Sequence, residues 1–320
     1  MANAITHIYI AKRVLEGLPM QIREEIELYK DAFLFGAAGP DFLFVLRELN
    51  DKKAALFANV MQYSGVYDVF NALSNYVTET NNEFVKYYAL GLLTHYVVDM
   101  KYHPLVNFLS EEVLGWDIPG NQINGIHHIV ESALDTHIIT EVLKYRNANS
   151  YRPLKNDFKV FWDTRREVAK IYTEIIGPAL QIPVTSGKIQ LAISGFRKVL
   201  KFATDPSGSK RRRYSREEEE NTMGNKKKRN LFREPEFYKE IDLLNRSRDS
   251  FSIIRNRTDE VSISTAVELM NECMPLCKKY IEKFLGSLGK DKRLDKHDFV
   301  VNYEGIDTSK KKSVFSFFSF

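Results

Sequence analysis

The chain has 320 residues, of which 44% are hydrophobic and 28% are charged, as is typical of globular proteins. This balance excludes disordered, collagen-like and disulfide-scaffold chains, and the length suits one large domain or two ordinary ones. The net charge of +4 is local, because residues 205–229 carry nine lysines and arginines against five acidic residues, while the rest of the chain is balanced.

Apolar residues recur at three- and four-residue intervals along most of the chain, a pattern that predicts helices. In chain order, the expected helices cover residues 9–18, which Pro19 ends, and residues 83–100, 126–143, 158–176, 189–202 and 263–285. Glycine and proline gather in the connections, and no alternating run ends in an Asn-Gly or Asp-Gly hairpin turn. We therefore expect an all-α fold with a single multi-helix domain.

A charged stretch interrupts the helical pattern at residues 204–234. Basic runs at 210–213 and 226–229 flank four glutamates at 217–220, and the stretch has little apolar surface to bury. It is expected to be a solvated loop or disordered, inserted within one domain. The predicted division is a helical core (1–204), a charged flexible insertion (205–234), C-terminal helices that pack on the same core (235–290) and a tail (291–320).

The first residues of the chain and its two cysteines indicate the cellular compartment in which the protein is expected. Residues 1–4 show neither the basic nor the apolar part of a secretory signal, and no apolar run reaches the ~18–20 residues of a membrane span. Cys273 and Cys277 lie four residues apart in a helical pattern, which is not a zinc or redox spacing. We expect a cytoplasmic protein whose two thiols are packed or on the surface.

Histidines and carboxylates occur at helical spacing in the first half of the chain. His95, Asp99 and His103 step by four residues, so they would line one helix face within about 80°. His127 and Glu131 form a second pair with the same spacing. Imidazole and carboxylate groups placed in this way can chelate a divalent ion, usually zinc, and no cysteine is nearby to close a structural site. A single such pair is common without metal, but two pairs on apolar helices favour a metal cluster, because burying them unpaired is costly.

The order of these motifs resembles that of the zinc-dependent phospholipase C family. The resemblance rests on Thr6-His7, Gly39-Pro40-Asp41, the series 95/99/103 and the pair 127/131, and it covers roughly residues 1–145. This family shares an all-helical fold and a trinuclear zinc site with S1/P1-type nucleases. The resemblance therefore implies a fold of phospholipase C/P1 nuclease type, with a charged loop insertion, and places the metal site in the helical core.

The resemblance also implies roles for individual residues. His7 would be an early zinc ligand, and Asp41 would contact the metal pair and act as the general base. His95 and Asp99 would hold the paired ions, with Asp99 bridging. The remaining zinc would be held by His103, His127 and Glu131, where His127 fits the HxxxE spacing of the family better than His128. His128 would support the ligands or belong to the core, and Asp135, one turn beyond Glu131, would support the ligands.

Two parts of the family pattern have no counterpart in this sequence. Family members begin with a tryptophan whose terminal amine and carbonyl bind zinc, whereas this chain begins with Met1. They also carry a histidine between the aspartate of the Gly-Pro-Asp motif and the HxxxD helix, and no histidine lies between Asp41 and His95. We expect two or three zinc ions, with two, or a partly vacant cluster, favoured.

The predicted function is that of a zinc-dependent phosphodiester hydrolase of phospholipase C type, in which metal-activated water attacks the phosphorus of a phospholipid. One alternative is an S1/P1-like nuclease, since a metal site of this kind does not distinguish phosphodiesters. Another is a catalytically impaired helical metal-binding module that docks on membranes or acidic partners. Residues 210–229 and 310–320, the latter with three lysines before four phenylalanines, are the candidate membrane contacts. Nucleic acid is the less favoured partner.

Overall fold

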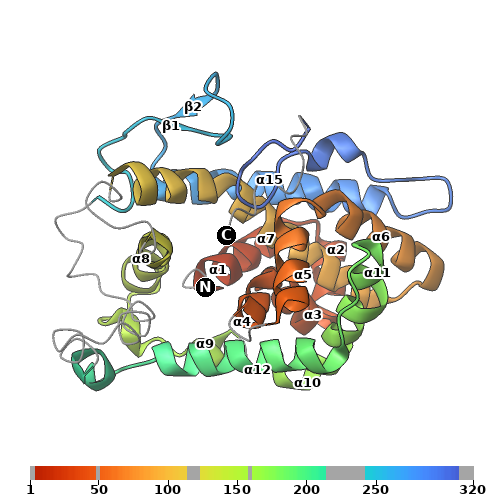
Figure 1. Ribbon diagram of the computed structural model, residues 1–320, viewed down its shortest axis with the longest axis horizontal. Helices are drawn as coiled ribbons and strands as arrows, with labels where there is room; N and C mark the ends of the chain where they lie inside the picture. Colours follow the sequence, from red (N-terminus) through yellow and green to blue (C-terminus); the bar gives the residue numbers. More distant parts are fainter. Residues whose placement is uncertain (1–3, 48–50, 114–122, 158–160, 214–241, 310–320) are drawn as a thin grey trace.

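The computed structural model describes residues 4–47, 51–113, 123–157, 161–213 and 242–309, and these are mostly helical (Figure 1). The α-helices are α1 (Ala4–Glu16), α2 (Met20–Leu28), α3 (Lys30–Ala37), α4 (Phe44–Arg47), α5 (Lys52–Tyr63), α6 (Val66–Thr80), α7 (Glu83–Asn107), α8 (Ile123–His137), α9 (Pro153–Asn156), α10 (Phe161–Lys170), α11 (Gly177–Ala179), α12 (Ser186–Ala203) and α15 (Ala266–Gly286). Single 3-10 turns span Gly39–Leu43, Ala148–Ser150 and Lys296–Phe299, and π-helical turns span Phe108–Val113, Ile138–Val142 and Ile171–Ile176. Strands β1 (Phe251–Ser252) and β2 (Val261–Ser262) pair antiparallel. The all-α fold class is confirmed, with this small pair as the only sheet of the described residues.

The helices follow the apolar periodicity of the sequence, and local signals set their ends. α1 ends ahead of Pro19, and α12 begins after Thr185, whose side chain accepts a hydrogen bond from the main chain of the first turn. α15 begins with a capping box between Thr265 and Glu268. The apolar pattern predicts an end near residue 100 for α7, but this helix continues through Pro104 to Asn107.

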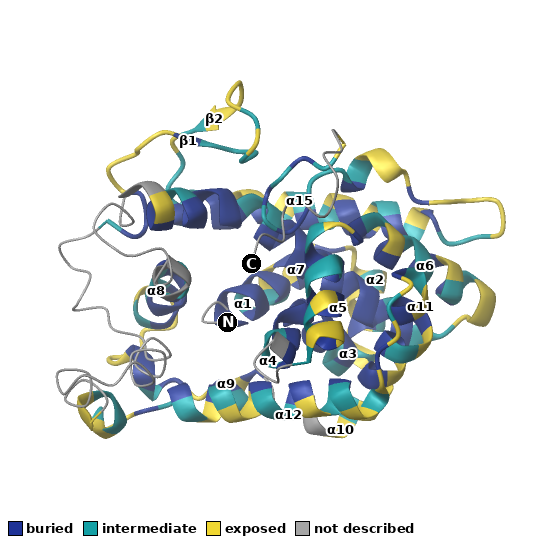
Figure 2. Cartoon of the chain, in the orientation of Figure 1, coloured by how far each residue is buried: buried dark blue, intermediate teal, exposed yellow. Residues whose placement is uncertain are grey.

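α7 is the central helix of the molecule (Figures 1 and 2). It packs against α3 and α15, with α1 and α6 also in contact. Apolar residues occur all around it, and most of its side chains are buried, as expected of a helix that other helices surround. A polar side chain on α7 is therefore removed from water and needs a partner within the protein.

α3 and α7 approach each other through a pair of glycines. A Cβ atom on Gly91 would lie 2.0 Å from the main-chain oxygen of Phe33, and one on Gly36 would lie 2.1 Å from that of Tyr88. These distances are far below van der Waals contact, so only glycine lets the two backbones lie this close. Because α3 leads into the turn at Gly39–Leu43, the contact also places that turn against α7.

Helix α15 and residues of the C-terminal region pack onto α7. Cys273 and Cys277 of α15 are buried free thiols. Residues 294–309, which the sequence pattern assigns to a tail, have many buried side chains, including that of Tyr303. The hydroxyl of Tyr96 on α7 donates a hydrogen bond to the main-chain oxygen of Val301 (2.6 Å). We refer to residues 301–307 as the C-terminal turn.

The charged insertion begins with ordered structure. Residues 209–213 are helical, and Lys210 Nζ donates to the main-chain oxygens of Lys201, Phe202 and Thr204 at the end of α12 (3.4, 3.1 and 2.9 Å). The first lysine of the basic run therefore caps a helix. Most of the proposed membrane contacts, residues 214–229 and 310–320, lie outside the described residues. Among the described helices, none combines the length and the apolar character that crossing a bilayer requires.

Replacing Gly91 with alanine is expected to lower the free energy of unfolding by at least about 1–3 kcal/mol, the usual cost of overpacking a core. Gly187→Ala is the matched control, since a Cβ atom at this position of α12 meets nothing within 4 Å. Alanine favours a helix over glycine by up to about 1 kcal/mol, so this variant should be unchanged or slightly more stable. Urea unfolding followed by circular dichroism measures both, and equal effects would contradict the close contact.

Candidate metal centre

The Gly39–Leu43 turn brings Asp41 against α7. Gly39 has a φ of +63°, and a Cβ atom there would lie 2.2 Å from the ring of His95, so both the backbone and the close approach require glycine. Pro40 follows at the start of the turn, where its fixed φ and missing N–H are tolerated. In this arrangement Asp41 Oδ1 lies 3.5 Å from His95 Nε2. The Gly-Pro-Asp motif thus packs a carboxylate against a histidine of α7.

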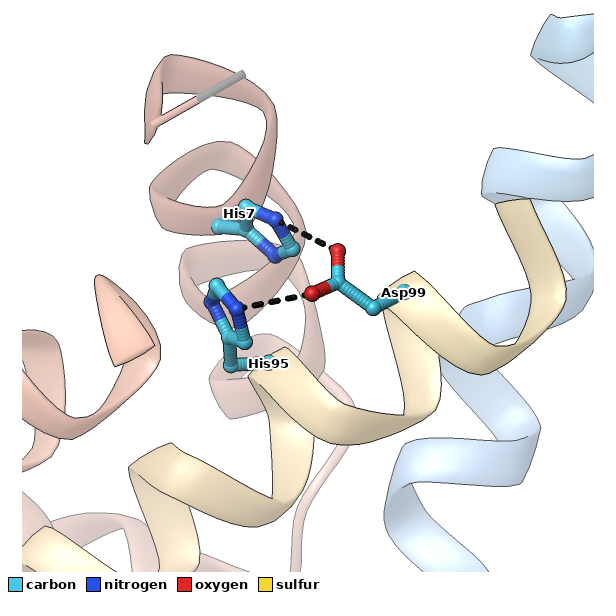
Figure 3. A group of neighbouring side chains, drawn as sticks. All are labelled: His7, His95 and Asp99. Atoms are coloured by element: carbon cyan, nitrogen blue, oxygen red, sulfur yellow. Dashed lines mark ion pairs between the residues drawn. The ribbon is translucent and has the colours of Figure 1, made fainter. Parts of the chain in front are cut away.

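His7 of α1 meets His95 and Asp99 of α7, and we call these three residues the first group (Figure 3). Each imidazole faces a different carboxylate oxygen, since His7 Nε2 lies 3.1 Å from Asp99 Oδ1 and His95 Nε2 lies 2.9 Å from Asp99 Oδ2. The two imidazole rings stack with their centroids 3.8 Å apart. None of the three side chains is more than 5% exposed, so the first group is closed to bulk water.

His103 of α7 meets His127 and Glu131 of α8, and these residues form the second group. Glu131 Oε1 lies 3.3 Å from His103 Nε2 and 3.2 Å from His127 Nε2. Asp99 links the two groups, because its Oδ1 also lies 3.8 Å from His103 Nε2. The side chain of His127 is 21% exposed, so the second group is the more open of the two.

The structure therefore brings the predicted site residues to one place: His7, Asp41, His95, Asp99, His103, His127 and Glu131. Two further residues stand beside them. His128 Nδ1 lies 3.3 Å from Glu131 Oε2. Asp135 Oδ1 accepts hydrogen bonds from both the main-chain nitrogen and the hydroxyl of Thr6, each at 2.8 Å. This double contact ties α1 to α8 and fixes the residue next to His7.

Main-chain carbonyls orient two histidines of α7. His95 Nδ1 lies 3.1 Å from the oxygen of Ala37, and His103 Nδ1 lies 2.7 Å from the oxygen of Tyr303. A carbonyl can only accept a hydrogen bond, so Nδ1 of each ring carries the proton. In the neutral imidazole this leaves Nε2 with its lone pair directed into the group. Contacts of this kind hold the ring of a metal-binding histidine and fix its tautomer.

Burial and charge shift the pKa values of the site strongly. Burial disfavours the charge on Asp99, but the histidines around it outweigh this cost and hold the pKa of its carboxyl well below the usual range. Burial also opposes a charge on His103, yet Asp99 raises the pKa of this histidine well above its usual value. The pKa of His95 is raised against the same opposition by Asp99 and Asp41. Without metal, the centre therefore holds protons on histidines beside an ionised carboxylate.

The donor set fits zinc. Tetrahedral zinc, with bonds of ~2.0–2.2 Å to nitrogen and oxygen, places two ligand atoms roughly 3.3–3.5 Å apart. The nitrogen–oxygen distances of the second group, 3.2 and 3.3 Å, are close to this range, and those of the first group, 2.9 and 3.1 Å, are slightly shorter. His7 Nδ1 is buried without a hydrogen-bond partner among the described residues, and His95 Nε2, although 2.9 Å from Asp99 Oδ2, makes no contact there with the geometry of a hydrogen bond. Each group offers three ligands, and Asp99, which lies between the groups, could be shared by both.

Sequence reasoning misses three residues at the centre, which are Asn107, Tyr303 and Glu304. Asn107 continues the four-residue row of α7 one turn beyond His103, so the spacing already noted would have identified it. Tyr303 and Glu304 belong to the C-terminal turn, and 200 residues separate Tyr303 from His103. No local pattern marks them, because only tertiary packing brings this turn to α7.

Replacing His95 with alanine should remove zinc from the purified protein, because this imidazole contributes to the first group and faces Asp99. His297→Ala is the matched control, since His297 is an exposed histidine outside both groups. We expect near-stoichiometric zinc in the wild type and the control, and at least one equivalent less in His95→Ala. Elemental analysis after dialysis measures this. The same zinc content in all three proteins would contradict the assignment.

Zinc binding should release protons near pH 7. Zinc binds imidazole in its neutral form, so it must displace the protons that the raised pKa values keep on His95 and His103. The affinity for zinc should therefore fall as the pH is lowered. It should increase with rising pH until the pH exceeds the raised pKa values of His95 and His103. Titration calorimetry in two buffers of different ionisation enthalpy counts the protons. An observed heat that is the same in both buffers would contradict the expectation.

One comparison with known proteins gives a match. A family model described as zinc dependent phospholipase C matches residues 6–172, just over half of the chain. The matched range contains both groups and Asp41, and it ends before α12, α15 and the C-terminal turn. Neither the comparison with curated proteins nor that with solved structures gives a match. The family is zinc-dependent and all-helical, in agreement with the donor set and the fold. The chain belongs to the zinc-dependent phospholipase C family.

Proposed function

We propose that this protein is a phospholipase C that hydrolyses the phosphodiester of a phospholipid to diacylglycerol and a phosphorylated headgroup. The observation that carries the proposal is the pair of three-ligand groups joined through Asp99. Two ions, one in each group, agree with the donor count, and Asp99 is placed to bridge them. The family match supports the reaction type and the phospholipid class of substrate.

In this proposal the first group and the second group have different tasks. The first group, closed to bulk water, would hold its ion with His7, His95 and Asp99. The second group is the side from which substrate enters, because His127 and His128 have side chains that are 21% and 40% exposed. The phosphodiester of a lipid therefore approaches from α8 and meets the buried carboxylates last.

Zinc, when bound, supplies Lewis acidity for the attacking water and for the charge that develops on the phosphoryl oxygens. Asp41 is proposed as the general base. Its carboxylate is 5% exposed and lies 3.5 Å from His95 Nε2, at the edge of the first group. From there it can accept the proton of the attacking water. The Gly39–Leu43 turn fixes its position, and the main-chain oxygens of Ala37 and Tyr303 hold His95 and His103 in their ligating orientation.

Asp41→Asn is expected to lower kcat for hydrolysis of phosphatidylcholine vesicles by about 10²- to 10⁴-fold, the usual contribution of a general base. Its zinc content should stay near that of the wild type, because both groups keep their ligands. Asp68→Asn, the same change at an exposed position of α6, should retain full activity. Product release from vesicles with zinc-loaded and metal-free protein provides the measurement.

The same preparation assayed on single-stranded DNA separates the phospholipase from an S1/P1-like nuclease. The proposal predicts zinc-dependent hydrolysis of the phospholipid and a much slower reaction on DNA. Faster turnover of DNA would assign the site to a nuclease. Zinc binding without turnover of either substrate would indicate a metal-binding module and contradict the proposed activity.

A further inference from the structure

The C-terminal turn lies outside the residues that the family model matches, yet it is firmly attached beside the second group. The hydroxyl of Tyr96 holds its first residue, Val301 (2.6 Å). The Asn302 side chain donates to the main-chain oxygen of Tyr63 (3.1 Å) and accepts from the main-chain nitrogen of Glu304 (2.9 Å). The turn is thus fixed to both α5 and α7, and its side chains have defined positions.

The main chain of the turn makes direct contact with a ligand of the second group. The oxygen of Tyr303 lies 2.7 Å from His103 Nδ1, so the turn fixes the ring and leaves Nε2 directed to Glu131. The next residue in the turn is Glu304. A contact at Tyr303 therefore brings a fourth carboxylate, in addition to those of Asp41, Asp99 and Glu131, to the centre.

The carboxylate of Glu304 lies at the end of the polar row of α7. Its Oε2 accepts from Asn107 Nδ2 (3.4 Å), one helical turn beyond His103, and its Oε1 accepts from the hydroxyl of Tyr63 (3.3 Å). Both donors are neutral, so they hold the carboxylate without cancelling its charge. Its side chain is 16% exposed, which leaves little water to screen that charge.

The positively charged side chain nearest to Glu304, that of Arg255, pairs mainly with another carboxylate. Arg255 Nη2 lies 3.0 and 3.1 Å from the two carboxylate oxygens of Glu111, whereas its Nη1 lies 3.8 Å from Glu304 Oε2. The guanidinium is therefore paired mainly with Glu111. Arg255 therefore offsets the charge of Glu304 only in part.

The histidines of the second group respond to this charge. Burial opposes ionisation of Glu304, but His103 and then His127 lower the pKa of its carboxyl. The effect is mutual. Burial opposes protonation of His103, but the negative charges of Asp99 and, after it, of Glu304 raise the pKa of His103.

Charge balance gives an independent reason for carboxylates beside the two groups. Two divalent cations carry four positive charges, and the neutral imidazoles offset none of them. Asp99 and Glu131, the carboxylates of the two groups, offset two of these charges, and an uncompensated remainder is unfavourable in a largely buried centre. Neighbouring carboxylates can offset this remainder: Asp41 and Asp135 beside the first group, and Glu304 on the side of the second group.

We propose that Glu304 is a positioning residue of the second group: its carboxylate, held by Asn107 beside His103, offsets the charge of a divalent cation bound by His103, His127 and Glu131 and so strengthens this binding. The inference rests on the proposed metal centre. It extends the functional part of the chain to the C-terminal turn, beyond the residues that define the family.

The test is a measurement of stepwise zinc dissociation constants by competition with a chromophoric chelator, on the full chain at constant pH. Glu304→Gln keeps the size of the side chain and its ability to accept hydrogen bonds but removes its charge. We expect one of the two constants to weaken about 10- to 100-fold, as for other groups that support metal ligands, with the other unchanged. Glu304→Asp, which keeps the charge, should recover most of the lost affinity.

Glu272→Gln is the matched control, because it removes an exposed carboxylate of α15 that pairs with Lys101 of α7 (3.2 Å) and should change neither constant. The free energy of unfolding of the metal-free proteins distinguishes a role of Glu304 in zinc binding from a role in stabilising the fold. If Glu304→Gln lowers this free energy but leaves both zinc constants at their wild-type values, the inference is wrong. If the wild type itself binds no zinc, the proposed metal centre fails, and the inference fails with it.

Discussion

The buried carboxylate of Asp99 is the constraint on which the rest of this structure depends. It lies on α7, a helix enclosed by other helices, and is 4% exposed. An ionised carboxylate in such a place is tolerated only if it is paired. Its partners come from two directions: His95 and His103 lie one turn before and after it, and His7 is delivered by α1. The positions of several elements follow from the need to bring these partners together.

The contacts that assemble the centre are also contacts that hold the fold together. Asp135 of α8 caps the start of α1 through Thr6, so the helices that carry His7 and Glu131 are joined directly. Gly39 admits the ring of His95 into the turn that carries Asp41. The C-terminal turn closes on His103. A ligand lost from the centre therefore leaves buried charges unpaired where three helices meet, which links zinc binding to stability.

The site residues that could be predicted from the sequence are those whose partners lie a few positions away on the same helix. Steps of four residues place Asp99 between two histidines and Glu131 beside His127, because an α-helix returns to the same face after about one turn. His7 and Asp41 follow from the resemblance to a family, since neither has a helical partner nearby in sequence. Tyr303 and Glu304 could not be predicted, because they reach the centre only through the packing of the C-terminal turn.

The general fold was predictable for the same reason. Apolar periodicity locates α1, α7 and α12, but it ends α7 too early, at a point where burial continues on all sides through Pro104 to Asn107. Charge composition alone also misses the role of Lys210, whose ammonium group caps the end of α12. The first difference comes from tertiary burial, which a local pattern does not contain, and the second comes from a contact within the chain that composition does not show.

The central claim is that the two groups form one binuclear centre bridged by Asp99. Anomalous diffraction at the zinc absorption edge, from crystals of the zinc-loaded protein, tests it most directly. The account predicts two peaks, one contacting His7, His95 and Asp99 and the other contacting His103, His127 and Glu131, with the Asp99 carboxylate between them. No anomalous peak at these residues, or a single peak that does not contact Asp99, would contradict it.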